Sequence, residues 1–480
     1  MSDQRSFGQL GALERVVVTR FNWAGLGVAA PLEAHPPQTP RRDLCVPLSE
    51  VGEELTVLWR EDGLGRVVGE RQSAPALGWE ELGCEQALRC PGCTLRQLSE
   101  TRRLEAQVES HCAALERLCP GALAQATVLR PQSAPRDDYR ARLYARLFHP
   151  AEPKERLITG MWARWGEAIE LGRCPVQTAG SRGLLQLLRA HAEERAWPKV
   201  VEGLTVQAMG AELEGVVTIH ARGVASAELI ERLGLSALPP ELMKRVGFYL
   251  SLLPVNAPRR AEAQLSWLCG AERLNWRCEE GFTWRVALPA WLPQSPRSVS
   301  VLRRLIWSAL ACPEGGHVFE LGCGVGTVSL WLMTRGLSVW GAELDERSVE
   351  ALRAAHKELI TSGGAELEAE AEGPPMRPAE VWGELKAEVI DGRRGLARAA
   401  QEGARFDRLL VHAMRSPITG LLPLAAHLKI SQLCYVAPSM PSLARDLAEE
   451  PRYQLTELRW LDQTPGSAQL LTVATLKLLK

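Results

Sequence analysis

Four cysteines in the first half of the chain have a spacing that suits metal chemistry. Cys84, Cys90 and Cys93 lie within ten residues, and Cys174 follows further along. Thiolates repel one another, so such a group usually serves a soft metal centre or a disulfide. Residues 1–5 open no signal peptide and no apolar run could span a bilayer, so we expect a cytoplasmic protein without a membrane segment. In that compartment metal binding is favoured over disulfides.

A glycine-rich segment near the carboxyl end has the pattern of a nucleotide-type site. Residues 317–321 predict a strand, and Gly322-Cys323-Gly324-Val325-Gly326 predicts a tight turn into a helix. Such glycines let the backbone approach a ligand closely, and the helix amino terminus faces that ligand. A second strand over residues 339–343 ends in Glu343, and a carboxylate at this place is suited to hold a ribose diol. Because the full dinucleotide fingerprint is absent, S-adenosylmethionine (SAM) is favoured over NAD and other nucleotides.

Later strands are predicted, with helices between them, at residues 388–390, 408–411 and 433–436. Strands that alternate with helices indicate a doubly wound α/β sheet. The 480 residues are too many for a single core, so roughly two to four domains are expected. The net charge of −1 excludes a whole-molecule attraction to nucleic acid. RNA binding must therefore come from local basic patches or aromatic surfaces.

The amino-terminal part predicts the elements that must position the cysteines. Short strands at residues 16–20 and 55–59, with a glycine-rich turn at residues 22–28, predict a small closed β-barrel, with another kind of small β-domain as the alternative. Apolar residues at helical spacing from 95 to 118 predict a long amphipathic helix directly after the first three cysteines.

A period-two alternation over residues 138–147 predicts a strand. It places Arg140, Arg142 and Arg146 on one strand face. This stripe suits contacts with phosphates, although a solvated strand face explains it almost as well.

On these residues the chain resembles the RNA (uracil-5-)-methyltransferase family, which makes 5-methyluridine in ribosomal and transfer RNA. The resemblance implies a multidomain α/β protein with three parts. Residues 1–75 resemble the TRAM domain, an OB-like β-barrel. Residues 76–285 resemble the central α+β RNA-binding domain, whose start matches Tyr139-Arg140-Ala141-Arg142, and residues 286–480 resemble a class I SAM-dependent methyltransferase. The implied partner is ribosomal or transfer RNA, and the oligomeric state stays open.

The resemblance also implies two ligands. In order and spacing, the ligands of the family's iron–sulfur cluster match Cys84, Cys90, Cys93 and Cys174. A [4Fe–4S] cluster is therefore favoured over a structural zinc ion, and it is expected to tie the central domain to the catalytic one. The family's contacts with SAM fall on Gln294, Gly322, Thr327, Glu343, Asp391 and His412. Glu320 replaces an aspartate, and the family's Asp-Pro-Pro-Arg segment reads His412-Ala413-Met414-Arg415, so SAM binding is expected to be weakened.

The catalytic positions depart from the family. Its Tyr-Val-Ser-Cys-Asn-Pro segment, which carries the nucleophilic cysteine, reads here Tyr435-Val436-Ala437-Pro438-Ser439-Met440. Pro438 therefore stands for the nucleophile, and Leu471 stands for the glutamate that removes the C5 proton. C5 of uracil is a poor nucleophile until a thiolate adds at C6, and proximity alone cannot replace that step. Cys434 lies four residues upstream of Pro438, about 13 Å along an extended strand, and is no substitute.

The sequence therefore predicts a relative of these enzymes that has lost C5 methylation and acts as an RNA-binding factor, a pseudoenzyme. One alternative is a SAM-dependent RNA methyltransferase that acts on another atom, such as a base nitrogen, with His412 as a candidate base. The other is C5 methylation by residues that the sequence does not identify.

Overall fold

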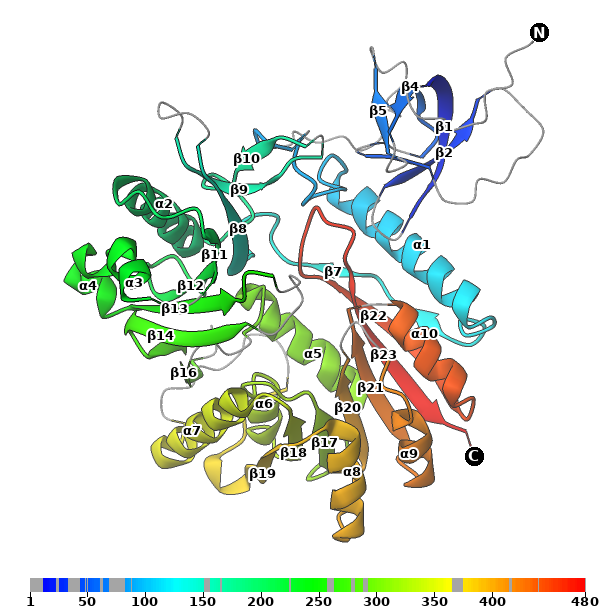
Figure 1. Cartoon of the computed structure of the whole chain (residues 1–480). Coiled ribbons are helices and arrows are strands. Elements are labelled where there is room, and N and C mark those ends of the chain that lie inside the picture. Colours follow the sequence, from blue (N-terminus) through cyan, green and yellow to red (C-terminus); the bar gives the residue numbers. More distant parts are fainter. Residues whose placement is uncertain are drawn as a thin grey trace.

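The computed structural model describes residues 12–22, 26–32, 44–47, 49, 51–60, 64–68, 83–87, 89–150, 156–164, 166–223, 226–256, 263–277, 281–287, 292–364, 374–413, 417–438 and 440–479. Three large sheets follow one another along the chain, and each has its own hydrophobic core (Figure 1). None of the helices in these ranges is long and apolar enough to cross a membrane.

The first sheet is antiparallel and barrel-like, in the order β3-β2-β1-β4-β5. Its strands are β1 (Leu13–Phe21), β2 (Gly27–Pro31), β3 (Cys45–Val46), β4 (Glu54–Trp59) and β5 (Gly65–Val67). An isolated bridge between Cys45 and Leu64 joins the two edges of the sheet. Val16, Val57 and Trp59 fill its interior, as the alternation of buried and exposed positions along a strand requires. The predicted barrel is therefore confirmed as a barrel-like sheet, whereas its identity as a TRAM domain stays a prediction.

The second sheet has seven strands in the order β10-β9-β8-β11-β12-β13-β14. They are β8 (Arg142–Phe148), β9 (Ile158–Trp162), β10 (Ala168–Glu170), β11 (Val201–Ala208), β12 (Gly215–Arg222), β13 (Val246–Leu253) and β14 (Gln264–Gly270). Helices α2 (Ala179–Glu194), α3 (Ala227–Leu233) and α4 (Pro240–Met243) pack with it into one core (Figure 1). The turn η1 (Leu235–Ala237) lies between the last two helices. The alternation along β8 puts Leu143, Ala145 and Leu147 into this core and leaves the other residues of the strand on the opposite face.

His220 on β12 gives the central sheet a predicted pH dependence. Burial, and next the charge of Arg142, lower the pKa of its imidazole to about 4, although Glu202 opposes this. An unfolded histidine titrates near 6.5, so the stability that this neutral ring contributes is complete above about pH 6.5 and is lost as the pH falls towards 4, by up to about 3 kcal/mol. We expect His220→Gln to remove that part of the slope in urea denaturation between pH 7 and 4. Equal slopes for wild type and variant would contradict this.

The third sheet is doubly wound, as predicted. Its order is β19-β18-β17-β20-β21-β23-β22-β6, with β7 paired to β22. The strands are β17 (His317–Leu321), β18 (Ser338–Glu343), β19 (Leu385–Val389), β20 (Arg408–His412), β21 (Gln432–Ala437), β22 (Tyr453–Asp462) and β23 (Leu471–Leu478). The five from β19 to β21 are parallel, and β23 runs antiparallel to both β21 and β22.

Helices cover both faces of this sheet (Figure 1). One face packs against α5 (Val299–Leu310), α6 (Ser329–Met333) and α7 (Glu346–Ser362). The other packs against α8 (Gly392–Gln401), α9 (Leu421–His427) and α10 (Met440–Glu449). The connections also contain the turns η2 (Pro296–Ser298) and η3 (Ala379–Val381) and a hairpin of β15 (Arg273–Arg277) and β16 (Thr283–Ala287).

The segment after the cysteines packs onto the third sheet, which the sequence did not predict. Helix α1 (Glu100–Leu118) lies against α10, and β6 (Thr127–Val128) and β7 (Gln132–Ser133) pair with β22. A buried ion pair between Arg103 Nε and Asp462 Oδ2, 3.1 Å apart, joins α1 to the end of β22. The domain boundaries at residues 75 and 285 stay predictions.

Candidate functional site

The glycine loop between β17 and α6 requires glycine at alternate positions. Gly322, Gly324 and Gly326 have φ values of 78°, 53° and 83°, in the left-handed region that other residues avoid. A Cβ at Gly326 would stand 2.1 Å from Leu352 Cδ1, and one at Gly322 would stand 3.1 Å from His412 O. At Gly324 a Cβ would meet nothing within 4 Å. The loop is therefore packed at both ends and open in its middle, where a ligand can approach the backbone.

Glu343, the last residue of β18, holds this loop. Its Oε2 accepts from Gly324 N at 3.1 Å, and its Oε1 accepts from the N–H groups of Leu344 and Asp345 at 2.6 and 3.1 Å. A carboxylate has about four acceptor positions, so a ribose diol would share the Glu343 carboxylate with the backbone of the loop.

A buried carboxylate and a histidine form a pair beside the loop. Glu320 on β17 is fully buried. Its Oε2 accepts from Ser329 Oγ at 2.5 Å, and its Oε1 lies 2.9 Å from His412 Nε2. The His412 side chain is 21% exposed. Within the described residues its Nδ1 makes no hydrogen bond, so this nitrogen is available at the carboxyl end of β20.

Five of the six predicted SAM contacts lie at one edge of the third sheet. Asp391 caps α8 by accepting from Arg394 N at 3.0 Å, and Ile390 N donates to Glu343 O at 2.8 Å. A surface hollow of about 500 Å³ opens beside Asp391. Thr327 lies at the end of the loop, where its carbonyl oxygen accepts from Arg303 Nε at 2.7 Å.

Gln294, the sixth position, is tied to a different part of the chain. Its carbonyl oxygen accepts from Ala141 N at 2.8 Å, directly before β8. No hydrogen bond within the described residues joins Gln294 to the glycine loop. Met414, Arg415 and Ser439 lie outside the described residues.

The two positions that the family resemblance assigns to catalysis face each other. Pro438 is exposed and directly follows β21, and Leu471 begins β23. Ala437 pairs with Thr472 in the antiparallel register, so the next position sets Pro438 opposite Leu471. His412 pairs with Val436 on the neighbouring strand. The fold therefore gathers these positions at the edge that holds the glycine loop, but neither Pro438 nor Leu471 has a group that can attack or take a proton.

Two other thiols near this edge are turned away from it. Cys434 is fully buried in the sheet, and burial strongly raises the pKa of its thiol. Cys323 lies within the glycine loop, but its Sγ packs against Gly341, 2.8 Å from where a Cβ would stand. Burial, and next the charges of Glu320 and Glu343, raise the pKa of Cys323 well above its usual value. Neither thiol is placed to replace the missing nucleophile.

Burial and neighbouring thiols raise the pKa of three of the four early cysteines, Cys90, Cys93 and Cys174. Burial, and next the nearby Cys174 and Cys90 thiols, raise the pKa of Cys93 to about 11 despite Arg140. Burial, and in part Cys84 and Cys90, also raise the pKa of Cys174. In the part of the chain that the structure describes, however, no group of three or more Cys, His, Asp or Glu side chains is arranged to hold a metal ion. The charges of the predicted metal ligands therefore act on one another, but the described residues form no metal site.

The surroundings of these thiols are rich in donors. Gly92 N donates to Cys90 Sγ at 3.4 Å, and the backbone of Val176 opposes the rise in the pKa of Cys174. Arg140 Nε and Arg164 Nη2 are buried and have no hydrogen-bond acceptor among the described residues. No local pattern marks Arg164 in the sequence, because its Nε donates to Cys90 O, 74 residues away.

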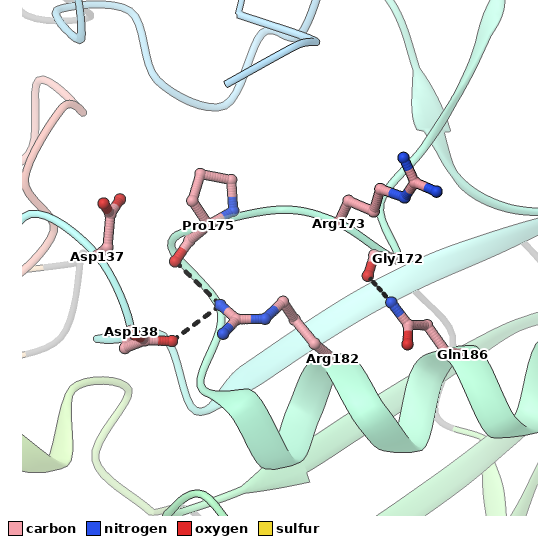
Figure 2. Close-up of a pocket in the computed structure, with 7 residues that line it drawn as sticks. All are labelled: Asp137, Asp138, Gly172, Arg173, Pro175, Arg182 and Gln186. Carbon is pink, nitrogen blue, oxygen red and sulfur yellow. Dashed lines mark hydrogen bonds and ion pairs between the residues drawn. The ribbon is translucent and has the colours of Figure 1, made fainter. Parts of the chain in front are cut away.

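A hollow of about 410 Å³ opens beside Cys174 and is lined by Asp138, Arg173, Pro175 and Arg182 among others (Figure 2). Arg182 Nη1 crosses it to Asp138 Oδ1 at 2.8 Å and to Pro175 O at 3.2 Å. This ion pair links the start of α2 to the segment before β8.

The cysteine segment contacts the loop that leads to Leu471. Leu95 N donates to Gly466 O at 2.8 Å, and Tyr139 Oη donates to Pro465 O at 3.2 Å. A Cβ at Gly466 would stand 3.6 Å from Cys93 Cβ. The segment that carries the predicted metal ligands therefore contacts the loop at residues 463–470, which leads to Leu471.

Comparisons with known proteins support the resemblance. No protein-family model matches the chain. An uncharacterized RNA methyltransferase of Streptococcus pyogenes serotype M1 is 22% identical over 415 residues, 83% of this chain and 84% of the relative. One from Halalkalibacterium halodurans is 22% identical over 433 residues, 87% of each chain. One from Bacillus anthracis is 22% identical over 452 residues, 90% of each.

A solved structure has the same fold. It is the tRNA (uracil-54, C5)-methyltransferase of Pyrococcus abyssi in complex with S-adenosyl-L-homocysteine. It aligns with a TM-score of 0.63 and 18% identity, over 96% of this chain and all of that one. The resemblance to RNA methyltransferases that the sequence predicted is therefore confirmed, and the fold matches that of a uracil-5 RNA methyltransferase.

Proposed function

We propose that this chain is an RNA-binding protein, built on an RNA methyltransferase fold, that binds SAM and has lost methylation of uridine C5. The observation that carries the proposal is the pairing of Ala437 with Thr472, which places the adjoining Pro438 and Leu471 at the edge that holds the glycine loop. Methylation at C5 needs a thiolate that adds to C6 and a base that removes the C5 proton. A proline and a leucine supply neither, and the thiols of Cys323 and Cys434 are buried elsewhere.

RNA is the proposed partner because the curated relatives are named RNA methyltransferases and the similar solved structure acts on tRNA. Ribosomal and transfer RNA both remain candidates.

Several features of the glycine loop support SAM binding. The open space beside Gly324 is a cradle that a side chain would fill, and the Glu343 carboxylate lies against it. The Pyrococcus abyssi enzyme was solved with the demethylated product of SAM. SAM would supply an electrophilic methyl group at this edge. Glu343 and Asp391 would hold its nucleoside, whereas His412 stands where the family resemblance implies a carboxylate, so we propose weakened binding.

We also propose that Cys84, Cys90, Cys93 and Cys174 hold a [4Fe–4S] cluster. The family resemblance favours a cluster over one zinc ion, and thiol charges that raise the pKa of Cys93 and Cys174 suit a shared positive centre. A cluster carries negative charge, and the buried N–H groups of Arg140 and Arg164 lack acceptors among the described residues. Hydrogen bonds to the sulfurs also tune such clusters. The proposed role is structural, because the segment contacts the loop at residues 463–470.

A second candidate function is favoured by the Glu320–His412 pair. A base nitrogen has its own lone pair and needs only a positioned methyl donor and a proton acceptor. Glu320 orients His412 through Nε2, and Nδ1 would take the proton. The chain would then be a SAM-dependent RNA methyltransferase that acts on an atom other than C5.

One assay separates these functions. Purified protein is incubated with methyl-labelled SAM and bulk RNA from cells that lack it, and the nucleosides are analysed. We expect SAM binding in calorimetry and no labelled 5-methyluridine. Labelled 5-methyluridine would overturn the proposal. Label in another nucleoside that disappears in His412→Gln, while SAM still binds, would establish the second candidate instead.

A further inference from the structure

The central sheet has an exposed aromatic cluster at β8 and β9. The face of β8 that points away from α2 carries Arg142, Tyr144, Arg146 and Phe148. Arg146 pairs with Gly160 and Phe148 with Ile158, so Trp162 shares this face with them. Tyr144 is 52% exposed and Trp162 is 50% exposed. We call the five residues Arg142, Tyr144, Arg146, Phe148 and Trp162 the β8–β9 platform.

The rings of the platform are held in place by one another. Phe148 and Trp162 meet edge to face, with centroids 4.7 Å apart and planes at 83°. The Arg146 guanidinium lies 5.9 Å from the Phe148 centroid and 5.7 Å from the Trp162 centroid. Such edge-to-face and cation–π contacts order the rings while they stay exposed.

Tyr144 is fixed separately, across the neighbouring strand. Its ring meets His220 edge to face at 5.4 Å, and a Cβ at Gly203 would stand 2.6 Å from its hydroxyl oxygen. The absence of a side chain at Gly203 therefore lets the tyrosine ring lie over β11. His220 in turn is 2.8 Å from Thr205 Oγ1. The platform thus presents rigid aromatic surface rather than freely rotating side chains.

The platform is also locally positive. Within the described residues neither Arg142 nor Arg146 forms an ion pair. Two acids on the strands of this sheet are already paired, Glu202 with Arg222 at 2.7 Å and Glu170 with Arg156 at 2.9 Å. With a net charge of −1 for the whole chain, two guanidinium groups that form no ion pair in the described part of the chain, beside exposed rings, mark a place where a polyanion can bind.

We infer that the β8–β9 platform stacks unpaired bases of a single-stranded RNA segment, with Arg142 and Arg146 on the adjoining phosphates. The inference rests on the proposed function for its RNA partner and adds that the bound segment is single-stranded. Exposed rings offer π-faces that bases in a duplex cannot reach, because those bases are already stacked. Guanidinium groups contact phosphates irrespective of sequence. The hydrogen bond between Ala141 N and Gln294 O ties the start of β8 to the segment that leads into α5, so RNA on the platform is held near the methyltransferase sheet.

The test measures fluorescence anisotropy of the full chain with a labelled uridine- and adenosine-containing RNA 12-mer, single-stranded or in a complete duplex. The variants are Tyr144→Ala and Trp162→Ala. The matched control is Trp267→Ala, a tryptophan on β14 of the same sheet that is 47% exposed and lies outside the platform. Because stacking on an aromatic ring is lost with each variant, we expect affinity for the single strand to fall about 10-fold or more for each, and to be unchanged in the control.

Arg146→Gln separates the phosphate contact from stacking. It should weaken binding to all single-stranded sequences alike and lower the slope of log affinity against log salt by about one. The three aromatic residues are about half exposed and Arg146 is partly exposed, so the thermal unfolding of the variants should stay close to that of the wild type.

The outcomes distinguish the platform from the proposed function. If the wild type binds neither RNA, the proposed function itself fails. If the wild type binds RNA and both ring variants bind it equally well, RNA binds elsewhere and the platform inference is wrong. If the ring variants lose duplex binding as strongly as single-strand binding, the claim that the platform reads unpaired bases is overturned.

Discussion

Gly326→Ala is expected to lower the free energy of unfolding by roughly 2–5 kcal/mol and to abolish SAM binding. Gly326 has φ of 83°, where an alanine is strained by about 1–2 kcal/mol. Its new Cβ would also stand 2.1 Å from Cδ1 of the buried Leu352, and overpacking of this kind adds about 1–3 kcal/mol. The glycine loop would be displaced from α7. Urea denaturation measures the stability, and calorimetry with SAM measures the binding.

Gly324→Ala is the matched control for the steric part of the stability loss. Its φ of 53° is also left-handed, but its Cβ would meet nothing within 4 Å, so only the backbone strain of about 1–2 kcal/mol is expected. Leu352→Ala makes room for the extra methyl group, so the double variant Gly326→Ala with Leu352→Ala should be less destabilised than the sum of the two single variants. Strict additivity would show that the clash is not the cause.

Cys93→Ser is expected to remove the iron from the protein and to loosen the loop at residues 463–470. We expect wild-type protein purified without oxygen to be brown and to contain iron and sulfide, because thiolates ligate such clusters. In the variant, residue 93 no longer binds the cluster, so the segment that contacts Gly466 loses this anchor. The hydrogen bond between Leu95 N and Gly466 O is therefore weakened. Metal analysis measures the first effect, and hydrogen–deuterium exchange at residues 463–470 measures the second.

Cys312→Ser is the control for the cysteine experiment. Burial raises the pKa of Cys312 to about 11, as for Cys93, but this thiol lies before β17 and outside the group of four. Iron content and loop protection should be unchanged by it. Colourless wild-type protein that contains zinc would contradict the cluster, and unchanged iron in Cys93→Ser would exclude Cys93 as a ligand.

Turns and strands within one segment could be predicted from the sequence because the residues of that segment determine them. The glycines of residues 322–326 predicted a tight turn, and all three have positive φ. The strands at residues 408–411 and 433–436 lie inside β20 and β21, since apolar runs of this length suit buried parallel strands. Boundaries were less exact. The helix predicted from residue 95 begins at Glu100. The backbone N–H of Leu95 donates to Gly466 O instead, and the Ser99 side chain caps the helix by accepting from Arg102 N.

Which distant residues meet depends on the tertiary structure. The sequence predicted that Pro438 and Leu471 stand where the family resemblance implies the catalytic pair, and the antiparallel register of β21 and β23, which pairs Ala437 with Thr472, brings these positions together. Glu320 and His412 are 92 residues apart and pair only because β17 and β20 are neighbours. The platform needed Trp162 of β9 beside Arg146 of β8. Strand order and register depend on the packing of whole sheets, so the pattern of residues within one segment does not specify them.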